Sequence, residues 1–164
     1  MIFGTVGFHF QGFERLVKRL DDLAPTLDER VVIQIGHTEY TPRNAEYFRF
    51  AADDATIDRL VRDSRVVVAH AGTGTILRCL ELGRPVIVMP RRAGFGEHVD
   101  DHQWEIAEAL AERRLILAVK SPEELTTELL LGDRPNPQCS TSTAIGTYVA
   151  SWLASLAKRY EGTT

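Results

Sequence analysis

The sequence has 164 residues, of which 44% are hydrophobic and 26% are charged, a balance typical of one globular domain with a substantial core. Its 23 acidic and 19 basic residues give a formal net charge of −4, so no overall positive field favours nucleic acid or anionic lipid. The two cysteines form neither a disulfide framework nor a zinc-binding spacing, and no apolar run approaches the ~20 residues of a membrane span. These features predict a cytoplasmic domain that does not bind nucleic acid.

Strands and helices are predicted to alternate along the chain. Short β-branched runs are typical of buried parallel strands, and longer stretches with apolar residues at helical spacing are typical of amphipathic helices. The predicted strands are 1–6, 31–36, 47–50, 65–69, 85–90 and 115–119, and the predicted helices are 13–20, 54–63, 75–82, 101–113, 121–131 and 145–160. This alternation predicts an α/β fold with a doubly wound, Rossmann-like parallel sheet.

The chain is expected to divide into two regions. Residues 1–131 form the α/β domain, and residues 132–164 form a loop and a C-terminal helix. That helix has an apolar face that includes Trp152 and Leu156. It packs either on its own domain or on a partner.

The turn after the predicted strand 65–69 carries the strongest binding signal, because ligands of open parallel sheets bind beyond the carboxyl ends of the strands. The residues of this turn are His70, Ala71, Gly72, Thr73, Gly74 and Thr75. Glycines permit close approach of the backbone, and amides at a helix N-terminus face an anion, so the turn suits a phosphate or diphosphate. The alternative is a tight turn in which a threonine only caps the helix.

The segment 91–103 is long, contains glycine and is rich in polar side chains, which is typical of a functional loop. His98 and His102 are four residues apart and lie beside Asp100 and Asp101, so a metal site requires that they share one helical face. The glutamate of the H-E-x-x-H pattern is missing, and the acidic pair is more simply a helix cap. We therefore predict no metal site.

Three short motifs, taken together, resemble a known family. The turn 70–75, followed by Gly83-Arg84-Pro85 and later by Asp101-His102-Gln103, is similar to the C-terminal, nucleotide-sugar-binding half of GT-B glycosyltransferases of the family-28 type. Residues 2–17 and 95–103 resemble the stand-alone members. These members are the catalytic subunit of the dolichol-linked GlcNAc transferase and bacterial exopolysaccharide glucuronosyl- or galactosyltransferase subunits. The resemblance covers residues 1–131 and implies a single GT-B C-terminal-type domain.

The resemblance implies inverting, metal-independent transfer of a sugar from a UDP-sugar, without a cofactor. The turn 70–75 would hold the diphosphate, and helix-terminus amides would stabilise the leaving group. The first loop, with Gly7, would face the cleft, and its His9 is a candidate general base, a phosphate donor or a plain polar residue. The remaining substrate-binding residues implied are Glu97, His98, Asp101, His102 and Gln103. Where relatives have a ribose-binding glutamate, this sequence has Arg78.

A complete GT-B enzyme has two such domains, so the acceptor-binding half is expected from a membrane-anchored partner chain. The first interpretation is a donor-binding catalytic subunit that lies at the inner face of the membrane through this partner and acts on a lipid-linked acceptor. The alternatives are a non-catalytic nucleotide-sugar-binding or assembly subunit and a sugar epimerase of related architecture. The isolated chain is also a candidate homo-oligomer.

Overall fold

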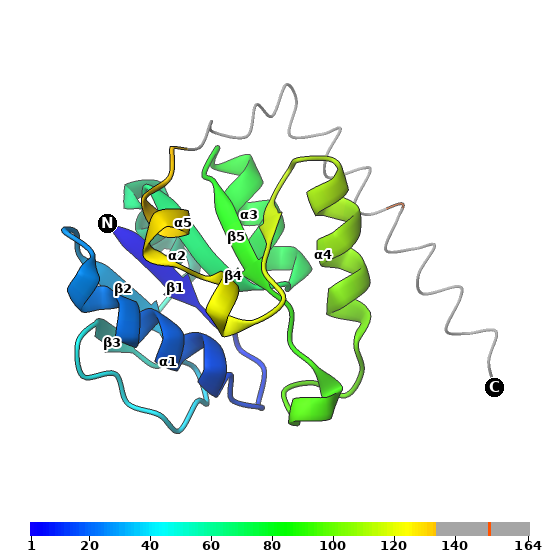
Figure 1. The fold of residues 1–164 in the computed structure, drawn as a ribbon, viewed down its shortest axis with the longest axis horizontal. Coiled ribbons are helices and arrows are strands. Elements are labelled where there is room, and N and C mark those ends of the chain that lie inside the picture. The colour runs from blue at the N-terminus through cyan, green and yellow to red at the C-terminus, as the bar shows by residue number, and fades with distance from the viewer. Residues whose placement is uncertain (134–150, 152–164) are drawn as a thin grey trace.

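The computed structural model describes residues 1–133 and Ser151. Its centre is a six-stranded sheet in the order β3-β2-β1-β4-β5-β6, in which all neighbouring strands are parallel (Figure 1). The strands are β1 (Ile2–Thr5), β2 (Val31–Gln34), β3 (Glu46–Phe48), β4 (Val66–His70), β5 (Val86–Met89) and β6 (Leu117–Ala118). The strand order reverses between β1 and β4, which is where doubly wound folds bind their ligands.

Helices cover both faces of the sheet and enclose two hydrophobic cores. The α-helices are α1 (Glu14–Leu23), α2 (Asp54–Asp63), α3 (Thr73–Glu81), α4 (His102–Glu112) and α5 (Thr127–Leu131). Residues of α1 and α5 pack on one face, which includes Ile2, while residues of α2, α3 and α4 pack on the other, which includes Phe3. Burial on both faces explains why the strand sequences are continuously apolar. The α/β, Rossmann-like fold predicted from the sequence is confirmed.

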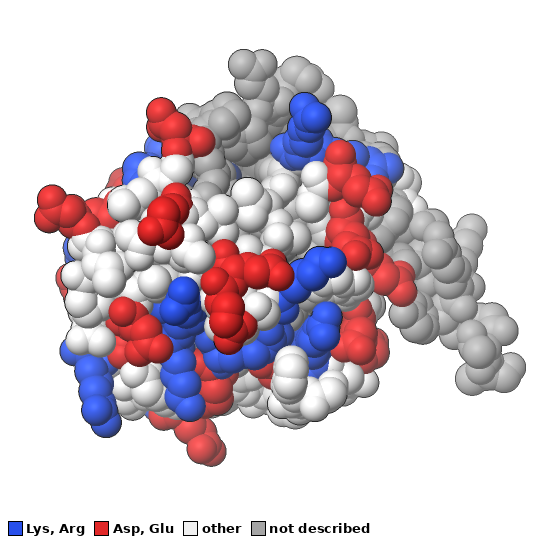
Figure 2. All heavy atoms as spheres, in the orientation of Figure 1, with Lys and Arg blue, Asp and Glu red and all other residues white. Residues whose placement is uncertain are grey.

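The surface carries charge of both signs. Figure 2 shows acidic and basic side chains interspersed over one face of the molecule, so no broad patch of one sign covers that face. Among the described helices, none is long and apolar enough to cross a membrane.

Most predicted elements are present with shifted ends, but the single helix predicted over 121–131 is wrong. A short 3-10 segment, η3 (Pro122–Glu124), is separated from α5 by Leu125, whose backbone is extended. The side chain of Leu125 is fully buried in the α1 core, and the extended backbone lets it point inward. Ser121 makes no side-chain cap, and the cap of α5 is instead Thr126, whose side chain accepts from the Leu129 amide.

The predicted division into residues 1–131 and 132–164 stays a prediction, because the C-terminal helix expected over 145–160 lies outside the described residues apart from Ser151.

Candidate functional site

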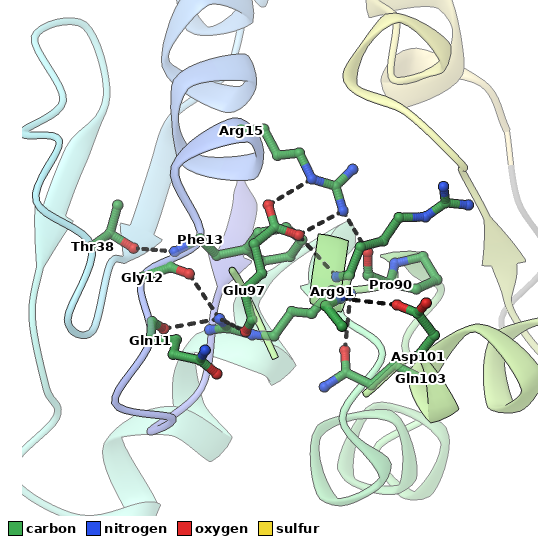
Figure 3. Close-up of polar contacts among 12 residues, drawn as sticks. Gln11, Gly12, Phe13, Arg15, Thr38, Pro90, Arg91, Glu97, Asp101 and Gln103 are labelled. Atoms are coloured by element: carbon green, nitrogen blue, oxygen red, sulfur yellow. Dashed lines mark hydrogen bonds and ion pairs between the residues drawn. The ribbon is translucent and has the colours of Figure 1, made fainter. Parts of the chain in front are cut away.

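Three loops meet at the carboxyl edge of the sheet, around the reversal of strand order. They follow β1, β4 and β5 and comprise residues 6–12, 71–72 and 90–101. Because the strands are parallel, their carboxyl ends lie at the same edge, and hydrogen bonds join the first loop to the third (Figure 3). Segments about eighty residues apart in the sequence therefore form one site.

Arg91 fixes the first loop to the third. Its side chain is fully buried, and Nη1 donates to the carbonyls of Gln11, Gly12 and Glu97 at 2.9, 2.9 and 3.0 Å. Its Nη2 donates to the carbonyl of Val6 at 2.8 Å. Burial lowers the pKa of Arg91 to about 10, so the guanidinium is still charged at neutral pH. Arg91 is therefore a rigid brace between the two loops.

Glu97, a predicted substrate ligand, belongs to the same hydrogen-bond network, since its carbonyl accepts from Arg91. Its Oε1 accepts from Arg15 Nε at 2.6 Å, and its Oε2 accepts from Arg15 Nη2 at 2.9 Å and from the Arg92 amide at 3.0 Å. Arg15 also donates to the Pro90 carbonyl at 2.7 Å. Both carboxylate oxygens of Glu97 are thus engaged by the protein, and they hold the loop after β5 against α1.

The start of α4 is also tied to this loop. The Gln103 side chain is 4% exposed, and its Oε1 accepts from the Arg91 amide at 3.1 Å. Asp101 Oδ1 accepts from the amide of Ala93 at 2.9 Å, so Asp101 closes the loop and makes no side-chain cap. The expectation that the acidic pair caps the helix holds only for Asp100, whose Oδ1 accepts from the His102 amide at 3.2 Å.

Three histidines and one aspartate form a cluster beside the brace. The rings of His9 and His98 stack with centroids 4.8 Å apart, and those of His98 and His102 meet edge to face at 4.7 Å. Asp100 Oδ1 lies 3.3 Å from His98 Nδ1 and also contacts His102 Nδ1. Burial, followed by the charges of His98 and Arg91, lowers the pKa of His9, which favours a neutral imidazole.

The geometry of this cluster differs from that expected from the sequence. His98 precedes α4, so the two histidines do not share a helical face. Nevertheless, one ligand atom from each of His98, Asp100 and His102 lies within 4.8 Å of the other two, which is compatible with the spacing of metal ligands. The absence of a metal from the mechanism stays a prediction.

The turn after β4 presents a helix N-terminus to this edge. The helix α3 begins at Thr73, two residues earlier than predicted, with Gly72 as N-cap and no side-chain cap. The amides of Thr73, Gly74 and Thr75 precede the first intrahelical bond, from the Ile76 amide to the Gly72 carbonyl at 3.1 Å. A Cβ built on Gly74 meets nothing within 4 Å. The alternative of a threonine-capped turn is thus not what forms, and the space beside Gly74 is open.

The His70 side chain packs against the backbone of this turn at Gly72 and against Gly7 of the first loop. Desolvation lowers its pKa to about 3, so the ring is neutral at physiological pH. A Cβ on Gly72 would lie 2.1 Å from His70 Nε2, and one on Gly7, where φ is +72°, would lie 2.6 Å from its Cε1. The ring therefore fits only between two glycines. Ala71, next to it, is fully buried. His70 and Ala71, both predicted substrate ligands, thus shape the backbone of the turn.

A cavity of about 300 Å³ opens beside the turn, on the sheet face covered by α2 and α3. Its lining contains both apolar and polar residues. The lining residues are Phe3, Thr5, Gly7, Phe8, Gln34, Asp54, Ile57, Val61, Gly74, Thr75 and Arg78. The position predicted to depart from the family, Arg78, faces this cavity and pairs with Asp58 at 2.6 Å and with Asp54 at 3.6 Å.

Sequence reasoning missed the structural roles of Arg91 and Arg15 and the position of Gln34 in the cavity wall. Arg91 follows a strand and precedes another arginine, which suggests a surface position, and its acceptors lie far away in the sequence. Gln34 ends an apolar strand, and this polar residue within a buried run was the one available signal.

Comparisons with known proteins agree with the fold. Residues 1–154 match the model of the glycosyltransferase family 28 C-terminal domain. The UDP-N-acetylglucosamine transferase subunit ALG13 of Debaryomyces hansenii is 27% identical over 138 residues, which cover 78% of this chain and 62% of that relative. The corresponding subunit of Cryptococcus neoformans is 38% identical over 82 residues, covering 49% of this chain and 37% of that relative. This chain thus spans less than two thirds of these relatives.

Solved structures share the fold. A solution structure of ALG13 has a TM-score of 0.56 and 20% identity, with 88% of this chain and 92% of that chain covered. MurG of Acinetobacter baumannii has a TM-score of 0.54 and 21% identity, with 78% of this chain and 38% of that chain covered. The fold, the bare helix N-terminus at the sheet edge and the match over residues 1–154 lead to one conclusion: the chain belongs to the glycosyltransferase family 28 C-terminal domain family.

Proposed function

We propose that the chain is the donor-binding catalytic subunit of a two-component inverting glycosyltransferase that takes its sugar from a UDP-sugar. The observation that carries this proposal is the N-terminus of α3 at the carboxyl edge of the sheet, which has no side-chain cap and whose Gly74 and Thr75 line a cavity. Such a terminus favours a diphosphate, because its N–H groups and the helix dipole both stabilise negative charge. Membership of a glycosyltransferase family supports the same ligand.

In this mechanism the diphosphate lies against the amides of residues 73–75, and negative charge grows on it as the bond to the sugar breaks. Fixed amides stabilise that charge without reorganisation, so the reaction requires no cofactor and no metal ion. The sugar lies toward the start of α4, where His98, Asp101, His102 and Gln103 reach its hydroxyls.

A general base accepts the proton from the attacking hydroxyl of the acceptor. His9 is our candidate, because its pKa is lowered and a neutral imidazole is the form that accepts a proton. Its ring stacks on His98, which holds it at the edge of the loop cluster. A base supplied by the partner chain is the alternative.

The acceptor is proposed to be lipid-linked and bound by a membrane-anchored partner subunit. The described domain is of the C-terminal type, and the relatives from Debaryomyces and Cryptococcus are themselves called transferase subunits. We propose that the transfer serves exopolysaccharide or glycolipid synthesis at the inner face of the membrane. The C-terminal helix with Trp152 is the proposed docking element for the partner, and it lies outside the described residues.

Calorimetric titration of the purified chain with UDP and a panel of UDP-sugars tests donor binding. We expect binding that EDTA does not change, and no transfer until membranes that contain the partner are added. Absence of binding would contradict the donor-site assignment. Transfer by the chain alone would contradict the two-component proposal, and donor binding without transfer in the reconstituted pair would favour a non-catalytic subunit.

A further inference from the structure

The loop after β5 and the start of α4 bring three potential metal ligands together around one carboxylate oxygen. Asp100 Oδ1 lies 3.3 Å from Nδ1 of His98 and also contacts Nδ1 of His102. His98 and Asp100 belong to the loop, whereas His102 is the first residue of α4. The ligands therefore converge by a route other than the shared helical face on which the prediction of no metal site was based.

The spacing of these atoms fits a zinc ion. Zinc binds imidazole nitrogen and carboxylate oxygen at about 2.0–2.2 Å in tetrahedral sites, so neighbouring ligand atoms lie about 3.3–3.6 Å apart. The distance between His98 Nδ1 and Asp100 Oδ1 is at the lower end of this range. The closer contact between Asp100 Oδ1 and His102 Nδ1 is a hydrogen bond, and an ion replaces the proton that these two atoms share. Metal binding therefore requires only a small movement of the His102 ring.

Charge and exposure at the cluster also favour a cation. Among residues 1–133, no arginine or lysine pairs with Asp100, so no fixed cation neutralises its carboxylate. The Asp100 side chain is 44% exposed and that of His102 is 33% exposed, so an ion can enter from solvent and keep a water ligand. His98 is less exposed, and its ring is held by stacking on His9. The cluster therefore combines one fixed ligand with two accessible ones.

The chemistry of the ligands selects the class of metal. Two imidazole nitrogens and one carboxylate oxygen suit Zn²⁺ and neighbouring transition metals, whereas Mg²⁺ and Ca²⁺ prefer oxygen ligands alone. We propose that His98, Asp100 and His102 form a binding site for a divalent transition-metal ion, with Zn²⁺ the ion that the geometry matches. The ion joins the loop after β5 to α4 and has no part in the proposed mechanism of transfer.

The site has a consequence for the donor sugar. His98 and His102 are also two of the side chains proposed to reach the sugar hydroxyls. An ion on their Nδ1 atoms holds both rings toward Asp100, so the ion and the sugar compete for the same side chains. Zinc is therefore expected to inhibit transfer without being needed for it. This consequence rests on the proposed function, whereas zinc binding itself does not.

Calorimetric titration of the purified chain with zinc chloride, without a histidine tag, tests the site. We expect one zinc ion per chain and a rise in Tm, because a ligand that binds only the folded state stabilises it. Magnesium chloride should produce neither effect. In Asp100→Ala and in His102→Ala, zinc affinity should fall at least about tenfold. Their Tm in EDTA should stay close to that of the wild type, because both side chains are partly exposed.

His37→Ala is the matched control, because His37 is an exposed histidine that packs against Phe50 and lies outside the cluster. This variant should keep the zinc affinity of the wild type. The proposal is overturned if the wild type binds no zinc, or if Asp100→Ala and His102→Ala bind it as tightly as the wild type. An equal loss of affinity in His37→Ala would indicate scattered binding by surface histidines and would overturn it as well.

Transfer assays with the partner-containing membranes test the competition. Zinc should inhibit the wild type, and EDTA should restore transfer. In Asp100→Ala, the zinc concentration that halves transfer should rise at least about tenfold, in step with the lost affinity. Equal sensitivity of the two chains, or a wild type that zinc does not inhibit, would refute the competition. If zinc bound as expected but no transfer occurred even without it, the proposed function would fail while the metal site stood.

Discussion

Replacing Arg91 by methionine tests whether the buried guanidinium is the main connection between the loops after β1 and β5. The variant keeps the apolar stem of the side chain and removes four hydrogen bonds to backbone carbonyls. The bonds to Val6 and Glu97 are buried, whereas those to Gln11 and Gly12 are partly buried and can be replaced by water.

Each buried carbonyl left without a donor costs about 1–3 kcal/mol, so two of them lower the free energy of unfolding by about 4 kcal/mol. For a domain of this size, this loss corresponds to a drop in Tm of roughly 10 °C. Urea unfolding followed by tryptophan fluorescence measures it, provided that the m-value is unchanged.

Arg92→Met is the control, because the Arg92 guanidinium lies over the Trp104 ring, 5.0 Å from its centroid, in a half-buried position. Its loss should cost less than about 1 kcal/mol. If the two variants differed by less than about 1 kcal/mol, the reasoning that Arg91 is a structural brace would be refuted.

Three further predictions follow from the site. Gly74→Leu should weaken UDP binding by more than tenfold without unfolding the chain, because the new side chain fills the open space beside Gly74 at the start of α3. Unchanged affinity in calorimetry would argue against this anion site. Because burial lowers the pKa of His70 to about 3, the unfolded chain binds a proton below about pH 6.5 that the folded chain excludes, so stability falls by up to about 1.4 kcal/mol per pH unit as pH decreases toward 3. His70→Phe should lose that slope in urea titrations from pH 6.5 to 4, and parallel curves for variant and wild type would show that His70 is not the titrating group. EDTA should leave UDP affinity unchanged. If EDTA lowered the affinity, and zinc restored it in the wild type but not in His102→Ala, then His98, Asp100 and His102 would hold a metal ion that donor binding requires.

The sequence predicted the sheet well, because its signals are local. The β-branched runs of β2, β4 and β5 are buried on both faces, as parallel strands must be, and the turns that lead from β1, β4 and β5 into helices contain glycine. The turn with Gly72 and Gly74 was identified for the same reason. The helix predicted over 121–131 failed because Leu125 is pulled into the core, a tertiary contact that no local capping pattern contains.

Much less of the site could be predicted, because its polar contacts join distant segments. Glu97 stands in a polar, glycine-containing loop and so resembles a ligand-binding residue, yet its partner Arg15 lies 82 positions away. Gln34 and Asp54 lie at the same cavity only because β2 and α2 fold against each other's neighbours in the sheet layer, and no local sequence pattern relates the two residues. Residue type therefore indicated which loops are rich in polar side chains. The fold decides which of these side chains form internal hydrogen bonds and which remain available to a ligand.

The ring of His70 between Gly7 and Gly72 has a consequence for how this sequence can evolve. A side chain gained at either glycine collides with the ring, so each such substitution is tolerated only after position 70 has accepted a smaller residue. A smaller residue at position 70 alone leaves a void beneath the turn, which costs stability. Each single step is therefore unfavourable, and the three positions are expected to change as a linked set among homologues, even though the first lies more than sixty residues from the other two.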